Sequence, residues 1–242
     1  SFRLSDRKVK NPNIYPYNVF RGKYIEPFVF SPITVLYGNN GSGKSTLLNI
    51  IANCLELKGK EHATSNSYGI VNYCSSFSSE CSYTFGEDDF GNTIRNIPTN
   101  SRYIKSEDIL YEIKKIQQKQ VLSYGMEYDY VKRGMSLPEV KKFLASKEGR
   151  KQEEYIKFAQ EKYSNGETSI QYFEEYLQLD ALYLLDEPEV SLSPANQVAL
   201  AEEINKMARL LECQFIIATH SPFMLGTLNT KIYNLDTEGY DV

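Results

Sequence analysis

A glycine-rich run that ends in lysine and serine is the part of the sequence most directly tied to chemistry. The run Gly38-Asn39-Asn40-Gly41-Ser42-Gly43-Lys44-Ser45 fits the pattern G-x-x-x-x-G-K-[ST] at every fixed position. Glycines at this spacing let backbone N–H groups turn inward around phosphate oxygens. Lys44 can reach the outer phosphates of a nucleotide, and the Ser45 hydroxyl can ligate Mg²⁺. The run, together with Thr46, therefore predicts a binding site for a nucleoside triphosphate.

The segments on either side of this run are those that a phosphate loop requires. The β-branched stretch 33–37 predicts a buried strand, and the apolar positions of 45–57 predict a helix. The amino-terminal end of that helix adds positive charge where the phosphates would lie. An exposed glycine turn with a solvated lysine is the alternative interpretation, and these flanks disfavour it.

Two carboxylates end a second apolar run, Ala181-Leu182-Tyr183-Leu184-Leu185-Asp186-Glu187. Asp186 would hold Mg²⁺ directly or through water. Glu187 could polarise an attacking water as a general base. An exposed strand-end turn, closed by Pro188, is the bland alternative, and the upstream phosphate loop disfavours it.

Three further segments can add to the same chemistry. Ser164 and Gly166 open a predicted helix in Tyr163-Ser164-Asn165-Gly166-Glu167, which would make a second small anion site or an ordinary helix start. His220 follows the apolar run 215–219, where it could touch the γ-phosphate or be structural. The turn Ser191-Leu192-Ser193 could meet a partner subunit.

The rest of the chain predicts an α/β protein interrupted by helices. Its 242 residues are 41% apolar and 24% charged, typical of a globular domain. We expect one core formed by two mixed α/β parts, 1–103 and 163–242, with a helical subdomain inserted at 104–162. Further strands are predicted at 24–30, 69–73 and 182–185, and a loop with short elements at 75–103. Helices are predicted from Ser106 and at 194–211. Another predicted helix begins with a capping box at Ser136 and continues to about Lys162.

Charge and cysteine content exclude some functions. The net charge of −4 gives no general reason to expect a nucleic-acid binder. The charge is unevenly spread, because residues 1–60 carry nine basic and three acidic groups, whereas residues 163–242 carry three basic and thirteen acidic groups. Residues 132–162 carry nine basic and five acidic groups, either a phosphate-binding surface or a solvated helix face. The four cysteines form no C-x-x-C pair, which disfavours zinc and favours reduced thiols in the cytoplasm. No apolar run reaches the ~18 residues of a membrane span.

The order of these motifs resembles the ABC-type ATPase superfamily. The run Asp186-Glu187-Pro188-Glu189-x-Ser-Leu-x-Pro and the run Thr219-His220-Ser221-Pro222 look most like its soluble AAA_21 and OLD/SMC-like branch, the AAA family ATPases. The resemblance covers about residues 20–60 and 160–236.

This resemblance implies a P-loop NTPase head with a parallel-sheet core, an antiparallel N-terminal β part and an inserted helical subdomain. ATP with Mg²⁺ would bind between two head-to-tail subunits, with Gly38 to Thr46 of one facing Ser164 and Gly166 of the other. Glu187 would be the catalytic base, His220 the γ-phosphate sensor, and Lys44 a catalytic phosphate contact.

The sequence departs from the family pattern in three places. Tyr-Ser-Asn-Gly-Glu replaces the usual Leu-Ser-Gly-Gly-Gln signature, no Gln precedes Gln117, and Ser193 stands where an Asp usually follows Leu192. Which residue replaces the missing Gln is therefore open. Tyr15, Tyr17 and Phe20 are alternatives for stacking on adenine, and each is as well suited to the core.

The leading hypothesis is a cytoplasmic ATPase whose two copies are joined by ATP and released by hydrolysis. It would drive or gate a partner, such as DNA or a nuclease or toxin protein of a phage-defence system, as a homodimer or a heteromer, without membrane insertion. The alternatives are the ATP-binding subunit of a membrane transporter, which the missing Gln disfavours, and a scaffold with negligible turnover, which Glu187 disfavours.

Overall fold

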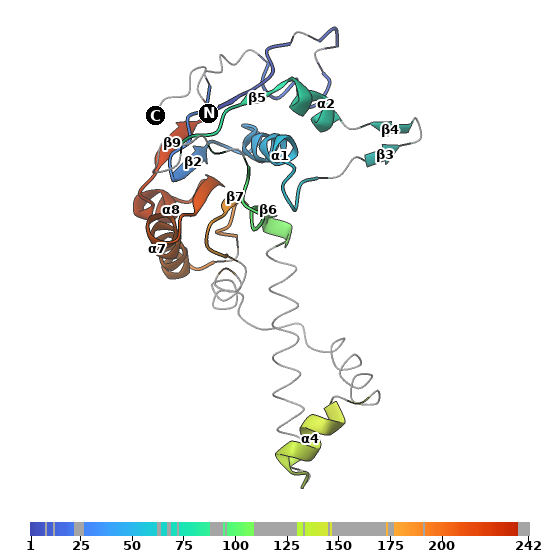
Figure 1. Cartoon of the computed structure of the whole chain (residues 1–242), viewed down its shortest axis with the longest axis vertical. Coiled ribbons are helices and arrows are strands. Elements are labelled where there is room, and N and C mark those ends of the chain that lie inside the picture. Colours follow the sequence, from blue (N-terminus) through green and yellow to red (C-terminus); the bar gives the residue numbers. More distant parts are fainter. Residues whose placement is uncertain are drawn as a thin grey trace. The chain divides into compact units, whose positions relative to one another are not determined.

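The chain is described here by a computed structural model (Figure 1). The residues that the structure describes are 1–7, 9–11, 13–21, 27–61, 64–66, 69–71, 73–87, 94, 96–108, 130–132, 134–144, 146, 173, 177–190 and 192–236. The chain divides into two compact units, one formed by residues 1–106 and 175–242 and the other by residues 107–174.

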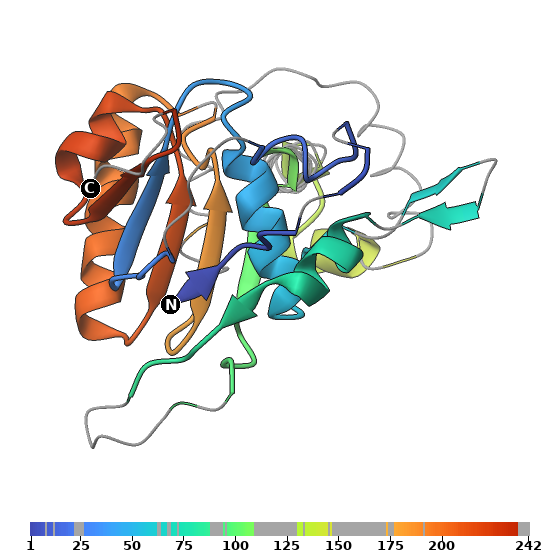
Figure 2. The same ribbon diagram turned by 90° about the horizontal axis from the view of Figure 1, so that it is seen from above.

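Five parallel strands form the centre of the first unit. In the order in which they lie side by side they are β6 (Arg102–Lys105), β7 (Leu182–Asp186), β8 (Gln214–Ala218), β2 (Ile33–Tyr37) and β9 (Lys231–Asn234) (Figure 2). The inner strands are buried almost throughout, which explains their continuous apolar runs. The predicted α/β class and the predicted strands at 33–37, 182–185 and 215–219 are confirmed, the last displaced by one residue.

Helices cover both faces of this sheet. Helix α1 (Lys44–Cys54) lies on one face, whereas α7 (Pro194–Leu210) and α8 (Pro222–Thr227) lie on the other (Figures 1 and 2). The predicted helix 45–57 ends three residues early, at Cys54, and Glu56 adopts a left-handed φ of 53° that a helix cannot continue. Helix α7 confirms the helix predicted at 194–211. It begins after Ser193, whose side chain accepts a hydrogen bond from the Asn196 N–H.

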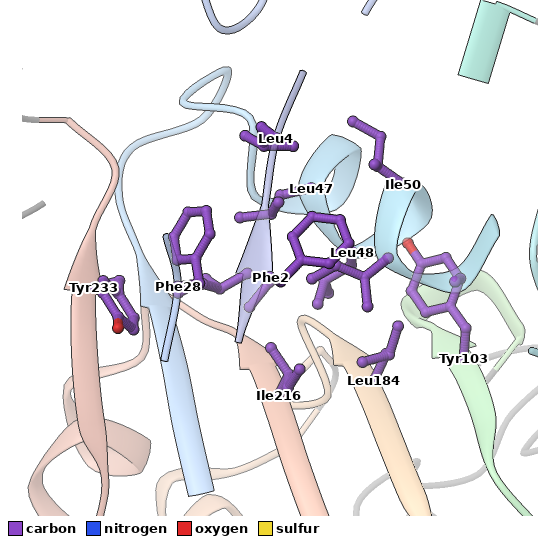
Figure 3. Packing of buried hydrophobic residues seen from close by; sticks show 14 of the residues in the cluster. Phe2, Leu4, Phe28, Leu47, Leu48, Ile50, Tyr103, Leu184, Ile216 and Tyr233 are labelled. Carbon is purple, nitrogen blue, oxygen red and sulfur yellow. The ribbon is translucent and has the colours of Figure 1, made fainter. Parts of the chain in front are cut away.

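The hydrophobic core lies between α1 and the sheet. Figure 3 shows Leu47 and Leu48 of α1 above Leu184 and Ile216 of the central strands, with Phe2 and Phe28 closing one side. Because the first turn of α1 is continuous with the glycine-rich run, this packing fixes the run to the sheet.

Short antiparallel elements lie beside the core. Strand β1 (Phe2–Arg3) pairs with β5 (Ser82–Tyr83), and β3 (Thr64–Asn66) pairs with β4 (Gly69–Val71). This confirms the predicted antiparallel N-terminal part. Of the strand predicted at 24–30, residues 27–30 are described, and Phe28 forms a single bridge to Phe2.

One stretch was predicted wrongly. A strand was expected to extend to residue 73 and a loop with short elements to follow from 75, but one helix, α2, spans Tyr73–Glu80. The serine-rich sequence gives little intrinsic preference for a helix. Its buried Phe77, in edge-on contact with Tyr17 at 4.8 Å between ring centroids, shows that tertiary packing stabilises it.

The second unit is described mainly by helix α4 (Leu137–Leu144). The Ser136 N–H and hydroxyl both donate to the Glu139 carboxylate, at 3.0 and 2.6 Å, and these bonds lower the pKa of Glu139. The predicted helix start at 136–139 is therefore confirmed. Its continuation to Lys162 lies outside the described residues, and the helical subdomain at 104–162 stays a prediction, although Ile104 and Lys105 belong to β6.

Candidate functional site

The predicted chemical residues meet at one edge of the parallel sheet. Leu36, Ala218 and Asp186 are register partners on the adjacent strands β2, β8 and β7. The residues that follow them therefore leave the sheet at the same edge, its carboxyl end. Ligands of open parallel sheets bind at this edge, which makes it the candidate site.

The glycine-rich run forms a tight loop between β2 and α1. Gly43 is the residue before α1 and has a φ of 101°, which side-chain-bearing residues rarely adopt. A Cβ atom at Gly43 would also lie 2.6 Å from Val19 Cγ1. Both the backbone angle and the close packing therefore require glycine there, as the sequence pattern indicated.

Lys44 is turned into this loop. Its side chain is 4% exposed, and the ammonium donates to the carbonyl oxygens of Gly38 at 2.6 Å and Asn39 at 3.1 Å. A buried ammonium surrounded by loop carbonyls is held close to where phosphate oxygens would bind.

Asp236, two residues beyond β9, holds the other side of the loop and was not among the predicted site residues. Its carboxylate accepts the Asn39 backbone N–H at 2.9 and 3.1 Å and the Asn39 side-chain N–H at 2.8 Å. A carboxylate two residues after the strand Lys231–Asn234, at the carboxyl end of the sheet, is the signal that could have identified it.

Asp186 faces the first turn of α1. Its Oδ1 accepts the Ser45 hydroxyl at 3.0 Å, and its Oδ2 accepts the Tyr103 hydroxyl at 3.2 Å. One carboxylate and one hydroxyl side by side fit Mg²⁺, which prefers oxygen ligands and completes its shell with phosphates and water. Within the described residues no three His, Cys, Asp or Glu side chains form a metal cluster, so the protein there offers no complete cage.

Glu187 has an unusual backbone. Its φ is 47°, in the left-handed region that costs a residue with a side chain about 1–2 kcal/mol. The N–H of Glu187 donates to Ala218 O at 2.9 Å, which holds the turn against β8. Its side chain is 28% exposed, and Oε1 lies 3.4 Å from His220 Nδ1. The turn thus brings a partly solvated carboxylate against the predicted γ-phosphate sensor.

Glu189 holds the turn that carries His220. It is 7% exposed, and its Oε1 accepts the Thr219 hydroxyl at 2.5 Å and the His220 N–H at 3.3 Å. Its Oε2 is buried without a hydrogen-bond partner among the described residues. From the sequence, Glu189 stood out only as part of a motif, because its partners lie about thirty residues further along the chain.

This contact is one part of a ring of hydrogen bonds. Thr219 accepts the Ser221 N–H, the Ser221 hydroxyl donates to Gln197 of α7, and Gln197 donates to Leu192 O. The Leu192 N–H donates to Glu189 O, which closes the ring. The turns after β7 and β8 are therefore fixed to each other and to α7.

We expect Thr219→Val to destabilise the protein by about 1–3 kcal/mol, because the buried Glu189 carboxylate and the Ser221 N–H each lose a hydrogen-bond partner. Urea unfolding measures the change. Thr227→Val is the matched control, since the Thr227 hydroxyl donates only to the carbonyl one helical turn earlier. Equal costs for the two variants would contradict the importance of the Glu189 contact.

The remaining predicted residues divide into two groups. Ser164, Gly166 and Ser191 lie outside the described residues. Among the aromatic candidates, Phe20 is buried in the core and Tyr17 packs on Phe77, whereas Tyr15 is 40% exposed and its hydroxyl lies 3.4 Å from Thr46 Oγ1. Phe20 also packs against the loop, at Gly43. Tyr15 therefore combines an exposed side chain with a position beside the loop.

The chain matches the model of the AAA_21 family, described as "AAA domain, putative AbiEii toxin, Type IV TA system", over residues 33–169 and 64–226. It therefore belongs to the AAA_21 family, which confirms the predicted branch of ABC-type ATPases. No curated protein matches it.

Solved structures share a partial likeness. A post-hydrolysis dimer of the ATP-binding cassette MJ0796 with ADP and Pi is 16% identical, with 100% of this chain and 97% of that chain covered and a TM-score of 0.44. The SMC head domain from Thermotoga maritima is 13% identical, with 86% and 87% covered and a TM-score of 0.40. Because both TM-scores lie below 0.5, the family membership stated above rests on the AAA_21 match alone.

Proposed function

We propose that this protein is a Mg²⁺-dependent ATPase that binds ATP in the loop Gly38 to Thr46. The observation that carries the proposal is the meeting of Lys44, Ser45, Asp186, Glu187 and His220 at one edge of the parallel sheet. The first three are the groups that bind phosphate and Mg²⁺, and the last two can act on the terminal phosphate.

Binding would use charges that the fold already places. The loop N–H groups and the α1 amino terminus receive phosphate oxygens, and the Lys44 ammonium exchanges its loop carbonyls for the outer phosphates. Ser45 and Asp186 would hold Mg²⁺, which would supply positive charge against the phosphates.

Glu187 is the proposed general base. Its carboxylate would take a proton from water as the water oxygen bonds to the γ-phosphorus, while the bond from the γ-phosphorus to the bridging oxygen breaks. His220, 3.4 Å from Glu187, would contact the γ-phosphate. The ring of hydrogen bonds through Glu189 supports both assignments, because it fixes the turn after β7 to the turn after β8.

The resemblance to ABC-type ATPases implies that a second subunit completes this site. We infer a head-to-tail dimer in which Ser164 and Gly166 of one subunit approach the nucleotide bound to the other. The basic excess of residues 1–60 and the acidic excess of residues 163–242 are compatible with this pairing. A heteromer with a different protein would use the same surface.

The partner that this ATPase acts on is inferred from the family. Its description names an AbiEii toxin and a type IV toxin–antitoxin system, which favours a cytoplasmic defence role with a protein or DNA partner. No described helix is long and apolar enough to cross a membrane. DNA binding that weakens steeply with salt in the ATP state would identify DNA as the partner.

Phosphate release from ATP tests the proposed activity. The full chain should release phosphate in Mg²⁺ and stop when EDTA removes the metal. Release that is absent under both conditions, or that continues unchanged in EDTA, would contradict a Mg²⁺-dependent ATPase.

We propose that Tyr15 stacks on the adenine base of ATP. Stacking on a base contributes about 1–3 kcal/mol, so Tyr15→Ala should weaken ATP binding while leaving tripolyphosphate binding unchanged. Titration calorimetry with both ligands measures this difference. Tyr83→Ala is the matched control, because Tyr83 has a similar exposure of 42% on β5. An equal loss for tripolyphosphate would show that Tyr15 shapes the loop instead of contacting adenine.

A further inference from the structure

The hydroxyl of Tyr103 reaches the carboxylate proposed to hold Mg²⁺. Tyr103 lies on β6 in register with Leu184 of β7, and Asp186 is two residues further along β7. Side chains two apart on a strand project from the same face, so Tyr103 and Asp186 share the face covered by α1. The Tyr103 hydroxyl donates to Asp186 Oδ2 at 3.2 Å.

The Tyr103 ring is held firmly enough to fix that hydroxyl. The side chain is 3% exposed and belongs to the core cluster beneath α1, where Figure 3 shows it beside Leu184 and Leu48. The end of β6 is also tied to α1, because Lys105 pairs with Glu61 at 3.0 Å and Glu61 accepts the Asn49 side chain of α1 at 3.1 Å.

Two hydroxyls from different elements therefore contact the two oxygens of Asp186. Ser45 on α1 donates to Oδ1, and Tyr103 on β6 donates to Oδ2. When a hydrogen bond fixes one oxygen of a carboxylate, the other oxygen faces a bound cation in one orientation. Hydrogen bonds of this kind to metal ligands raise the affinity of metal sites.

We propose that Tyr103 is a positioning residue for the divalent cation. It holds Asp186 Oδ2 so that Oδ1 and the Ser45 hydroxyl together face the metal. This assignment rests on the proposed function, because it concerns the same Mg²⁺–ATP site. It also gives β6, whose sequence Arg-Tyr-Ile-Lys contains no glutamine, a defined contact with that site.

The test compares two tyrosines that each lose one buried oxygen. Tyr103→Phe keeps the core ring and removes the bond to Asp186. Tyr183→Phe is the matched control, because Tyr183 is fully buried in β7 and its hydroxyl contacts the Gln178 backbone, away from the site. Electron paramagnetic resonance with Mn²⁺ as the probe, in the presence of ATP, gives the dissociation constant of the metal without depending on turnover.

Tyr103→Phe is expected to raise the Mn²⁺ dissociation constant about ten-fold, with ATP binding in EDTA unchanged. Tyr183→Phe should leave the Mn²⁺ constant within two-fold of the parent while lowering the unfolding midpoint. An unchanged Mn²⁺ constant in Tyr103→Phe, or an equal rise in both variants, would overturn the assignment. Failure of the parent chain to bind Mn²⁺ and ATP would instead overturn the proposed function and this assignment with it.

Discussion

Glu187→Gln is expected to slow ATP hydrolysis by about 100- to 10,000-fold, the usual contribution of a general base. Glutamine keeps the size of the side chain but cannot accept the proton of the attacking water. The left-handed backbone and the bond from the Glu187 N–H to Ala218 O should persist, so ATP should still bind. Phosphate release measures the rate, and nucleotide retained after gel filtration measures binding.

Glu203→Gln is the control for this variant. Glu203 lies on α7, where it pairs with the exposed Lys206 and, within the described part of the chain, forms no hydrogen bond with a proposed site residue, so its loss should leave the rate unchanged. Hydrolysis by Glu187→Gln at the parent rate would show that another group takes the proton.

Lys44→Ala should weaken ATP binding by about 10- to 100-fold, since a hydrogen bond to a charged group contributes about 1.5–3 kcal/mol. The buried ammonium now bonds two loop carbonyls and would be the main positive charge at the outer phosphates. Calorimetric titration with Mg²⁺-ATP measures the affinity. Urea unfolding of the same variant separates lost phosphate contact from a loosened loop.

Lys206→Ala supplies the comparison, because this exposed lysine of α7 forms only a surface ion pair with Glu203. Its affinity for ATP should equal that of the parent. If Lys44→Ala bound ATP as tightly as Lys206→Ala, the loop would not be the phosphate site.

Local patterns revealed the residues that can act on a nucleotide. The phosphate loop, the strand ending in Asp186 and Glu187, and the strand followed by His220 were each readable within a few residues, since backbone requirements and apolar runs are local signals. The parallel order of strands then brings these segments to one edge of the sheet.

The residues that support them could not be predicted in this way. Tyr103 contacts Asp186 across 83 positions of the chain, and Asp236 contacts Asn39 across 197. Such pairs depend on strand order and register, which no local pattern specifies. Helix α2 was missed for a related reason, because its stability comes from Phe77 packing in the core instead of from its own serine-rich sequence.

We propose that ATP joins two copies of this chain and that hydrolysis separates them. Sedimentation velocity of Glu187→Gln with and without Mg²⁺-ATP tests it most directly, because this variant should bind ATP without consuming it. We expect a monomer without nucleotide, a dimer with Mg²⁺-ATP, and no dimer when Lys44→Ala is added to the same chain. A variant that binds one ATP per chain and still sediments as a monomer would contradict the claim.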